Sequence, residues 1–467
     1  MQNNKLIEGA TQSLSFKLVV IGFLTLLLMI PLGMVSSLVG ERASNKNSVA
    51  EQIYADWSRK QTLQGPILTI PYRTYIKTKK ETKLHIAYIH LLPEQLNIDG
   101  EVTPSILYRS IYEAVVYKSD LNVKGMFKVP NIDELGVSTK DILFNKASLS
   151  FGLSDLRGVQ ERIELNFSGK KYFFNPGIRS SQVAEVIRNG VSVPISLNKR
   201  NSTFAFDFNL KLNGSESLFF LPYGKESVVR LHSSWENPSF IGDFLPDERE
   251  VNKEGFQARW SVVDINRAYP QLFKGEAVYK LKHKKEYKQG SKYDYSYGSN
   301  SYLSSSFGVN LMVPVDYYQK SSRSIKYGSL IIILTFLALF FVEIFLKKRI
   351  HGFQYILIGI GLILFFALLI SLSEHIGFDA AYIVSALVTI ALITLYSKSV
   401  FKNMKFVLML FGILFIFYAF IYILLQLQDY SLLLGVVMLF GTLASIMYIS
   451  RDIDWYNIAK ETQASKE

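Results

Sequence analysis

Long apolar runs near both ends of the chain predict helices that cross a membrane. Leu18 to Val39 is a run of 22 residues without a charge, and about 20 residues suffice to span the hydrocarbon core as a helix. Five further runs of about spanning length lie in the C-terminal third: Tyr327 to Leu346, Phe353 to Leu372, Ala380 to Tyr396, Phe406 to Leu425, and Ser431 to Ile449. The pattern therefore predicts six transmembrane helices, one N-terminal and five C-terminal.

The first run is predicted to be an uncleaved anchor. A secretory signal has a shorter apolar region of about 7 to 15 residues and a small-residue cleavage site. The stretch Ser36 to Gly40 fits such a site only loosely. Pro31 inside the run predicts a kink, because proline is tolerated in membrane helices.

Basic residues in the short loops predict the orientation, because Lys and Arg are retained on the cytoplasmic side. Lys347, Lys348 and Arg349 follow one run, and Lys398, Lys402 and Lys405 follow another, whereas the loops Ser373 to Asp379 and Gln426 to Tyr430 contain no Lys or Arg. Lys5 and Lys17 flank the first run. We therefore expect both termini inside the cell and residues 40–326 outside the cytoplasm.

Within residues 40–326 the pattern changes to alternation, which is typical of half-buried strands. It is clearest from Phe204 to Leu212, and Ile163 to Phe167 and Leu84 to Tyr88 repeat it. Gly and Pro interrupt the runs at Gly65-Pro66, Pro130, Asn175-Pro176-Gly177, Pro194 and Pro222. The spacing predicts an antiparallel, meander-like sheet architecture, a β-sandwich-like domain of one or two lobes.

Two segments of this region depart from the strand pattern. Glu41 to Lys60 is polar with spaced apolar residues and predicts a short surface helix that leads to the sheet. Leu281 to Ser306 combines lysines with Tyr, Ser and Gly, a composition that predicts a mobile loop. Its tyrosines and lysines could instead stack on sugars or bases.

Charge and cysteine content narrow the function classes. The chain has no cysteine, which excludes disulfides and cysteine chemistry. The net charge is +12, and residues 40–326 hold 40 of the 51 Lys and Arg but 30 of the 39 Asp and Glu. A segment outside the cytoplasm does not meet nucleic acid, so anionic lipid headgroups, envelope polymers or simple solubility are the alternatives.

No known catalytic or cofactor motif is present. Phosphate loops, HExxH, GxSxG and dinucleotide fingerprints are all missing from the sequence. His85 and His90 are five apart on an expected strand and so point to opposite faces, which argues against a shared metal. We predict no catalytic, cofactor-binding or metal-binding residues.

Ionisable residues at the ends of membrane helices are the candidate functional positions. Glu343 lies four residues before Lys347, so the two either pair at the interface or line a polar site. Glu374, His375 and Asp379 surround a turn, which predicts either a pH-responsive or docking contact or a hydrophilic hairpin that ends two helices. The absence of charge mid-membrane in the last four helices argues against an ion-coupled transporter.

Several motifs occur in an order that is specific in combination. They are Glu41-Arg42, Thr62 to Tyr72 (TLQGPILTIPY), Asp155 to Gly158 (DLRG), Ser233 to Phe240 (SSWENPSF) with Phe244 to Pro246, Val315 to Lys320 (VDYYQK), and Ser371 to Phe378 (SLSEHIGF). On these motifs the whole chain resembles the CreD family of bacterial inner-membrane proteins, also described as the cell envelope integrity or Cet family.

The resemblance implies a plasma-membrane protein, in a family linked to a two-component regulatory system, that supports envelope integrity and affects susceptibility to colicins and β-lactams. It implies no catalytic activity or cofactor. Most of the motifs also have a structural interpretation: Trp235 and Phe240 as core aromatics, Gly65-Pro66 and Gly242 as turns.

These observations combine into one hypothesis and two rivals. We expect a cytoplasmic N-terminus and anchor (1–39), an extracytoplasmic β-rich domain (40–326), a five-helix bundle (327–450) and a cytoplasmic tail (451–467). The expected role is non-enzymatic support of envelope integrity and stress tolerance by a multi-pass inner-membrane protein. Its expected partners are the lipid bilayer and an unidentified envelope component, and a homo-oligomer is a further candidate assembly.

The first rival is a transporter or lipid-handling protein with a cavity among the C-terminal helices. The second is an enzyme that acts on envelope polymers through the carboxylates Asp243, Asp247, Glu248 and Glu250, a run that otherwise predicts a solvated loop.

Overall fold

A computed structural model describes residues 14–77, 82–129, 136–198, 201–267, 269–274, 305–312, 317–346, 350–401, 403–427 and 431–451. The chain divides into two compact units: residues 1–47 with 315–467, which contain the membrane helices, and residues 48–314, which contain the strands. Each unit is described by itself. The expected loop from Leu281 to Ser306 falls almost wholly outside the described residues, as does Pro130.

A helix covers each of the six apolar runs. The long helices are α2 (Leu14–Trp57), α5 (Gly328–Leu346), α6 (Gly352–Ile376), α7 (Phe378–Phe401), α8 (Met404–Gln426) and α9 (Ser431–Arg451), and the short amphipathic α4 (Tyr317–Lys326) precedes α5. Among the described residues, α2, α6, α7 and α8 are long and apolar enough to cross a membrane, and α4 with α5 forms a fifth candidate bent by 41°. Six crossings and their orientation stay a prediction.

Helix α2 is longer than expected. It runs without interruption through Pro31 and on to Trp57. The helix expected between Glu41 and Lys60 is therefore present, but as a continuation of the anchor helix and not as a separate short helix. No proline or helix-ending turn lies between Gly40 and Trp57, and a helix continues until such a signal stops it.

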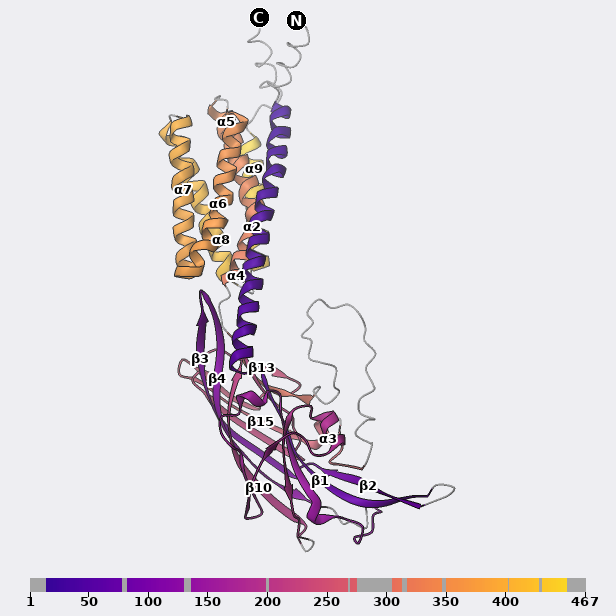
Figure 1. Cartoon of the computed structure of the whole chain (residues 1–467). Helices are drawn as coiled ribbons and strands as arrows, with labels where there is room; N and C mark the ends of the chain where they lie inside the picture. The colour runs from indigo at the N-terminus through magenta and orange to yellow at the C-terminus, as the bar shows by residue number, and fades with distance from the viewer. Residues whose placement is uncertain are drawn as a thin grey trace, which may run out of the picture. The chain divides into compact units, whose positions relative to one another are not determined.

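Helices α5, α6, α7 and α8 lie together in one bundle (Figure 1). Helix α5 contacts α6, α6 contacts α7, α7 contacts α8, and α8 contacts α5. Helix α4 contacts α5, α6, α7 and α8. Helix α9 contacts α8. The end of the bundle at which α4 lies is called here the α4 end.

The second unit consists of two large sheets. The first, sheet A, has the strand order β13-β17-β11-β1-β5-β9-β8, with β2 paired to β1 and β16 paired to β2; sheet B has the order β14-β15-β12-β3-β4-β10-β6-β7. The strands are β1 Gln61–Lys77, β2 Thr82–Leu91, β3 Gln95–Arg109, β4 Tyr112–Lys128, β5 Ala147–Leu153, β6 Glu164–Phe167, β7 Lys170–Phe173, β8 Asn175–Pro176, β9 Gly190–Ile195, β10 Thr203–Ser215, β11 Ser217–Phe220, β12 Glu226–Ser233, β13 Pro238–Gly242, β14 Glu248–Asn252, β15 Gly255–Val263, β16 Leu272–Lys274 and β17 Phe307–Leu311. A short helix, α3 (Ser181–Val186), lies between β8 and β9.

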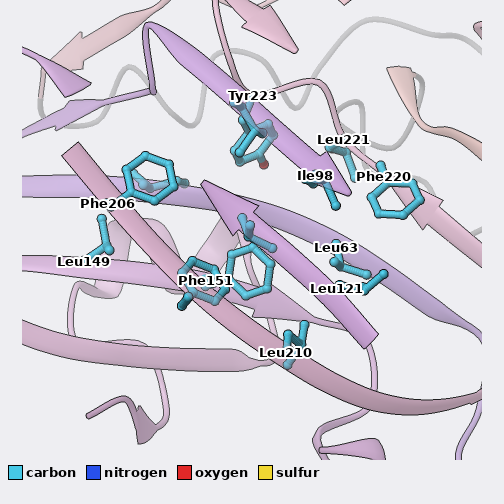
Figure 2. Packing of buried hydrophobic residues seen from close by; sticks show 14 of the residues in the cluster. Leu63, Ile98, Leu121, Leu149, Phe151, Phe206, Leu210, Phe220, Leu221 and Tyr223 are labelled. Carbon is cyan, nitrogen blue, oxygen red and sulfur yellow. The ribbon is translucent and has the colours of Figure 1, made fainter. Parts of the chain in front are cut away.

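One hydrophobic core joins the two sheets, so the two lobes considered from sequence are not seen. Leu63, Leu149 and Phe151 of sheet A and Leu121 and Phe206 of sheet B belong to one buried cluster (Figure 2). Phe151 of β5 meets Phe208 of β10 edge to face at 5.1 Å between ring centroids. The sandwich-like prediction is therefore confirmed.

The clearest strand prediction is also confirmed. Strand β10 buries Phe204, Phe206, Phe208, Leu210 and Leu212 and exposes the residues between them. Such a strand has one face on the core and one in water. The expected strand at Ile163 to Phe167 is found as β6.

Other strand predictions need correction. Leu84 and Ile86 of β2 are 58% and 36% exposed, so this strand is not half-buried, because its first residues extend past the core. Gly65-Pro66 is no turn: it lies inside β1, where the register with β5 shifts. The sheets are not a simple meander either, since β1 pairs with β11 and β3 pairs with β12 in parallel.

Candidate functional site

Glu343 is the most buried of the four carboxylate and histidine candidates. Its carboxylate accepts hydrogen bonds from the Lys17 ammonium of α2, from the Ile350 backbone N–H at 3.0 Å and from the Tyr355 hydroxyl at 3.4 Å. The expected partner, Lys347, lies outside the described residues. The pairing of Lys17 with Glu343 was not predicted from sequence, because 326 positions separate the two residues.

Glu374 is held at the α4 end of the bundle. Its carboxylate accepts a hydrogen bond from the Tyr318 hydroxyl of α4 at 3.0 Å. The Arg42 guanidinium of α2 lies 4.0 Å away. Three helices, α2, α4 and α6, therefore meet at this carboxylate.

Asp379 joins a second set of helices at the same end. It accepts hydrogen bonds from the Gln426 amide at 2.5 Å and from the Tyr422 hydroxyl at 3.4 Å, both from α8. The Lys320 ammonium of α4 lies 3.8 Å from it and also donates to Gln426 at 3.3 Å. Asp379 thus connects α4, α7 and α8.

His375 does not share these contacts. Its side chain is exposed, and no hydrogen bond or ion pair to it is seen in the described part of the chain. The cluster predicted at this turn therefore separates into two carboxylate contacts and one exposed imidazole. This arrangement ties helices together and resembles no set of acid, base and nucleophile.

The β domain carries an open groove of about 320 Å³ that sequence analysis did not predict. It lies over β3, β12, β14 and β15 and is lined by Glu101, Val102, Thr103, His232, Ser233, Ser234, Glu250, Asn252, Glu254, Gly255, Phe256 and Gln257. The segment Ser233-Ser234, from one of the motifs noted above, forms part of its wall.

Strand register places four polar side chains of the groove in one row. Glu250 of β14 pairs with Gln257 of β15, Gln257 with His232 of β12, and His232 with Glu101 of β3. Neighbouring strands lie about 4.8 Å apart, so the backbones at Glu250 and Glu101 are separated by about 14 Å. Side chains in one such row face the same side of the sheet.

The groove is acidic although the domain around it is basic. Glu101, Glu250 and Glu254 line it, and no Lys or Arg does. The run from Asp243 to Glu250, expected to be a solvated loop, instead enters strand β14 at Glu248. Asp247 accepts from the Ser261 N–H at 2.7 Å, and Glu248 pairs with Arg259 at 2.8 Å, so only Glu250 of this run reaches the groove.

The motif from Asp155 to Gly158 forms a hydrogen-bonded clamp at the end of α2. Asp155 accepts from the Arg59 backbone N–H at 3.1 Å and from the Arg157 guanidinium at 2.6 Å, and Arg157 also donates to the Ala55 carbonyl at 2.6 Å. The Gln61 amide donates to the Asp155 carbonyl at 2.8 Å. The Arg157 hydrogen bond lowers the pKa of Asp155 to about 2.

The clamp leaves no space for a side chain at Gly158. A Cβ at Gly158 would lie 2.3 Å from the Asn213 carbonyl oxygen. This motif is therefore structural, as is the aromatic pair noted from sequence. Trp235 is half-buried and donates to the Asn237 and Met312 carbonyls at 3.1 Å, and Phe240 packs on Trp260.

His90 is fully buried, whereas His85 is exposed because it lies in the first part of β2, which extends past the core. The His90 ring contacts the Thr69 hydroxyl at 3.0 Å and the Gln182 amide oxygen at 2.9 Å. Burial lowers the pKa of His90. No group of three metal-ligating side chains occurs among the residues described.

One family of known proteins resembles this chain over most of its length. A family model described as "Inner membrane protein CreD" matches residues 13–456. The inner membrane protein CreD of Escherichia coli (strain K12) is 31% identical over 449 residues, which cover 95% of this chain and 94% of that protein. A putative nutrient binding protein from Legionella pneumophila aligns over 39% of this chain and 68% of its own, with 8% identity and a TM-score of 0.20, a likeness too weak to support an argument.

The family match spans both the helices and the β domain, and the related protein is covered almost end to end. The chain belongs to the family of inner membrane proteins described as CreD.

Proposed function

We propose that this protein is a non-enzymatic, multi-pass membrane protein that supports envelope integrity by binding an envelope component in the groove of its β domain. The observation that carries the proposal is the row Glu250, Gln257, His232 and Glu101. It presents carboxylate, amide and imidazole groups side by side along one open groove.

The chemistry of the groove selects a ligand class. Three carboxylates without a lining Lys or Arg favour an amine-bearing or hydroxyl-rich ligand over a phosphate or another anion. An amino sugar or a cationic peptide of the envelope has these groups. The basic charge of the whole domain left anionic lipid, envelope polymers and simple solubility as alternatives, whereas the groove itself favours a cationic or hydroxyl-rich ligand.

Spacing in the groove suits an extended ligand. The backbones that carry Glu101 and Glu250 are three strand spacings apart, about 14 Å. Their carboxylates can therefore contact separate groups along one ligand.

The orientation of the groove completes the proposal. We place residues 40–326 on the extracytoplasmic side, since the basic short loops belong inside. A cysteine placed at the exposed Tyr75 of this cysteine-free chain should react with an impermeant thiol reagent in intact cells. Labelling only after the cells are lysed would contradict the orientation.

Binding tests the groove itself. The full chain in detergent micelles is titrated with soluble amine-bearing envelope glycan fragments and with the same fragments after N-acetylation. We expect the free amines to bind more tightly, and Glu250→Gln and Glu101→Gln to weaken binding several-fold.

Glu248→Gln is the matched control, because Glu248 lies on the same strand but pairs with Arg259 outside the groove. An equal loss of binding affinity in the control and in the groove variants would refute the groove as the binding site. Cleavage of the fragments during the titration would refute a non-enzymatic role.

The transporter or lipid-handling alternative gains no support from the candidate carboxylates. Glu343, Glu374 and Asp379 each bond to neighbouring helices. Alanine at these positions should lower the amount of folded protein in step with function. Lost function at normal protein levels would favour the alternative.

A further inference from the structure

Strands β1 and β2 continue past the rest of their sheet as a two-stranded arm (Figure 1). Strand β5 pairs with β1 no further than Thr69, and a loop hydrogen-bonds to β1 no further than Arg73. Strand β16 pairs with β2 no further than Ile89. Beyond these points the two strands pair only with each other among the described residues. Residues 73–77 and 82–86 are called here the β1–β2 arm.

Strand register places three apolar side chains on one face of the arm. Tyr75 pairs with Leu84, and Arg73 pairs with Ile86. Residues that pair directly share a face, as do residues two apart on one strand. Tyr75, Leu84 and Ile86 are 57%, 58% and 36% exposed, and Arg73 on the same face is exposed as well. The arm therefore presents an apolar face with a cation on it to the surroundings of the domain.

The core of the β domain does not need this face. The same strands supply their core residues before the arm begins, with Leu68 and Ile70 on β1 and Ile89 and Leu91 on β2, each at most 3% exposed. An isolated two-stranded hairpin is marginally stable in water, and exposed strand edges invite unwanted pairing. A surface that covers the apolar side chains would stabilise the arm and remove this liability.

The charge of the arm indicates what covers it. Residues 73–86 contain five Lys and Arg and one Glu, whereas residues 40–326 contain 40 Lys and Arg and 30 Asp and Glu. These 14 residues thus carry four of the ten excess positive charges of the whole segment. An anionic lipid surface attracts such a cluster of Lys and Arg, whereas a second copy of the arm repels it. Apolar and tyrosine side chains beside basic ones suit the boundary between headgroups and acyl chains.

We propose that the β1–β2 arm docks on a bilayer surface rich in anionic lipid. Leu84 and Ile86 enter the boundary of the acyl chains, and Arg73 meets the lipid phosphates. Tyr75 lies at headgroup depth, where tyrosine is favoured and where aqueous reagents on that side still reach it. The acidic groove shares no residue with the arm and favours the opposite charge in its ligand, so the two surfaces act independently.

Vesicle binding by the full chain tests the arm. The chain is reconstituted in nanodiscs of phosphatidylcholine and mixed with vesicles of phosphatidylcholine, with or without phosphatidylglycerol. Because the chain has no cysteine, Leu84→Cys accepts a single environment-sensitive dye. We expect cosedimentation and a blue shift of the dye with the anionic vesicles alone. Equal binding to neutral vesicles, or binding to neither kind, would overturn the proposal.

The position of the dye separates the arm from the rest of the domain. Val263→Cys places the same dye on β15, at a site that is 41% exposed. This protein should cosediment with anionic vesicles without a blue shift. A shift at Val263 that equals the shift at Leu84 would overturn the arm as the contact. Association of the nanodiscs in the absence of vesicles would identify a second copy as the occupant and would overturn the lipid.

A pair of double variants tests the charges. Arg73→Gln with Lys83→Gln should lower the vesicle partition coefficient roughly 30-fold, since each Lys or Arg near an anionic surface contributes about fivefold. Lys118→Gln with Lys128→Gln removes the same charge from exposed positions of β4 and should leave the coefficient nearly unchanged. Equal losses in the two double variants would assign binding to net charge and overturn the arm.

Apolar contact is tested separately. Leu84→Asn keeps every charge of the arm and should weaken vesicle binding several-fold. Ile265→Asn is the matched control, because Ile265 is 85% exposed and lies outside the arm. Unchanged binding by Leu84→Asn would overturn the insertion of the apolar face.

Discussion

The ion pair between Lys17 and Glu343 gives the sharpest prediction for the helical unit. It connects the N-terminal anchor helix α2 to the C-terminal helices, and the side chains are 28% and 8% exposed. Lys17→Met removes the ammonium and keeps most of the stem. Among the described residues, the Glu343 carboxylate then keeps two neutral donors, the Ile350 N–H and the Tyr355 hydroxyl.

The expected cost follows from burial. Removing one partner of a buried ion pair costs about 3–5 kcal/mol, because the other charge stays buried without compensation. Partial exposure of Lys17 lets water screen some of this loss, so we expect about 2–3 kcal/mol. That is a rise of roughly 30- to 150-fold in the unfolding equilibrium constant.

The double variant decides whether charge is the cause. Replacing both partners removes the uncompensated charge. Lys17→Met with Glu343→Gln should therefore be more stable than Lys17→Met alone. The assay is unfolding of the full chain by added SDS in mixed micelles, followed by far-UV circular dichroism.

Two results would refute this reasoning. One is additivity, in which the double variant loses the sum of the two single losses. The other is a comparable loss for the control Lys405→Met, an exposed lysine of α8 that should change stability by less than about 0.5 kcal/mol.

Three further predictions concern the clamp and the α4 end. Asp155 has a folded pKa of about 2, below its usual value. Its stabilising contribution is therefore present above pH 4 and is lost as the pH falls toward 2. Unfolding free energy measured against pH should show this slope, and Asp155→Asn should abolish it. Gly158→Ala should destabilise the β domain by about 1–3 kcal/mol in thermal melts, whereas Gly40→Ala, with open space around it, should not. Tyr318→Phe removes the hydrogen bond to Glu374 and should cost about 0.5–1.5 kcal/mol in the SDS assay; a gain in stability would contradict that bond.

Local patterns predicted the apolar helices and the clearest strand of this protein. Uncharged runs of spanning length predicted a helix at every such position, because each unpaired backbone group in lipid is costly and a helix pairs them within one segment. The alternation from Phe204 to Leu212 predicted strand β10 and also which of its two faces is buried. The full length of α2 was not predicted. The anchor was recognised as an uninterrupted apolar run, and the helix after Gly40 is polar.

Tertiary structure alone decided which distant residues meet. Lys17 contacts Glu343 across the helical unit. In the β domain, strand pairing brings four side chains from four strands into one row of the groove: Glu101, His232, Gln257 and Glu250. Sequence spacing determines which face of its own strand or helix a side chain occupies, but pairing between strands depends on register, and one residue of slip would reverse the face. The candidate carboxylates were therefore found from sequence, whereas their partners and the groove came only from the fold.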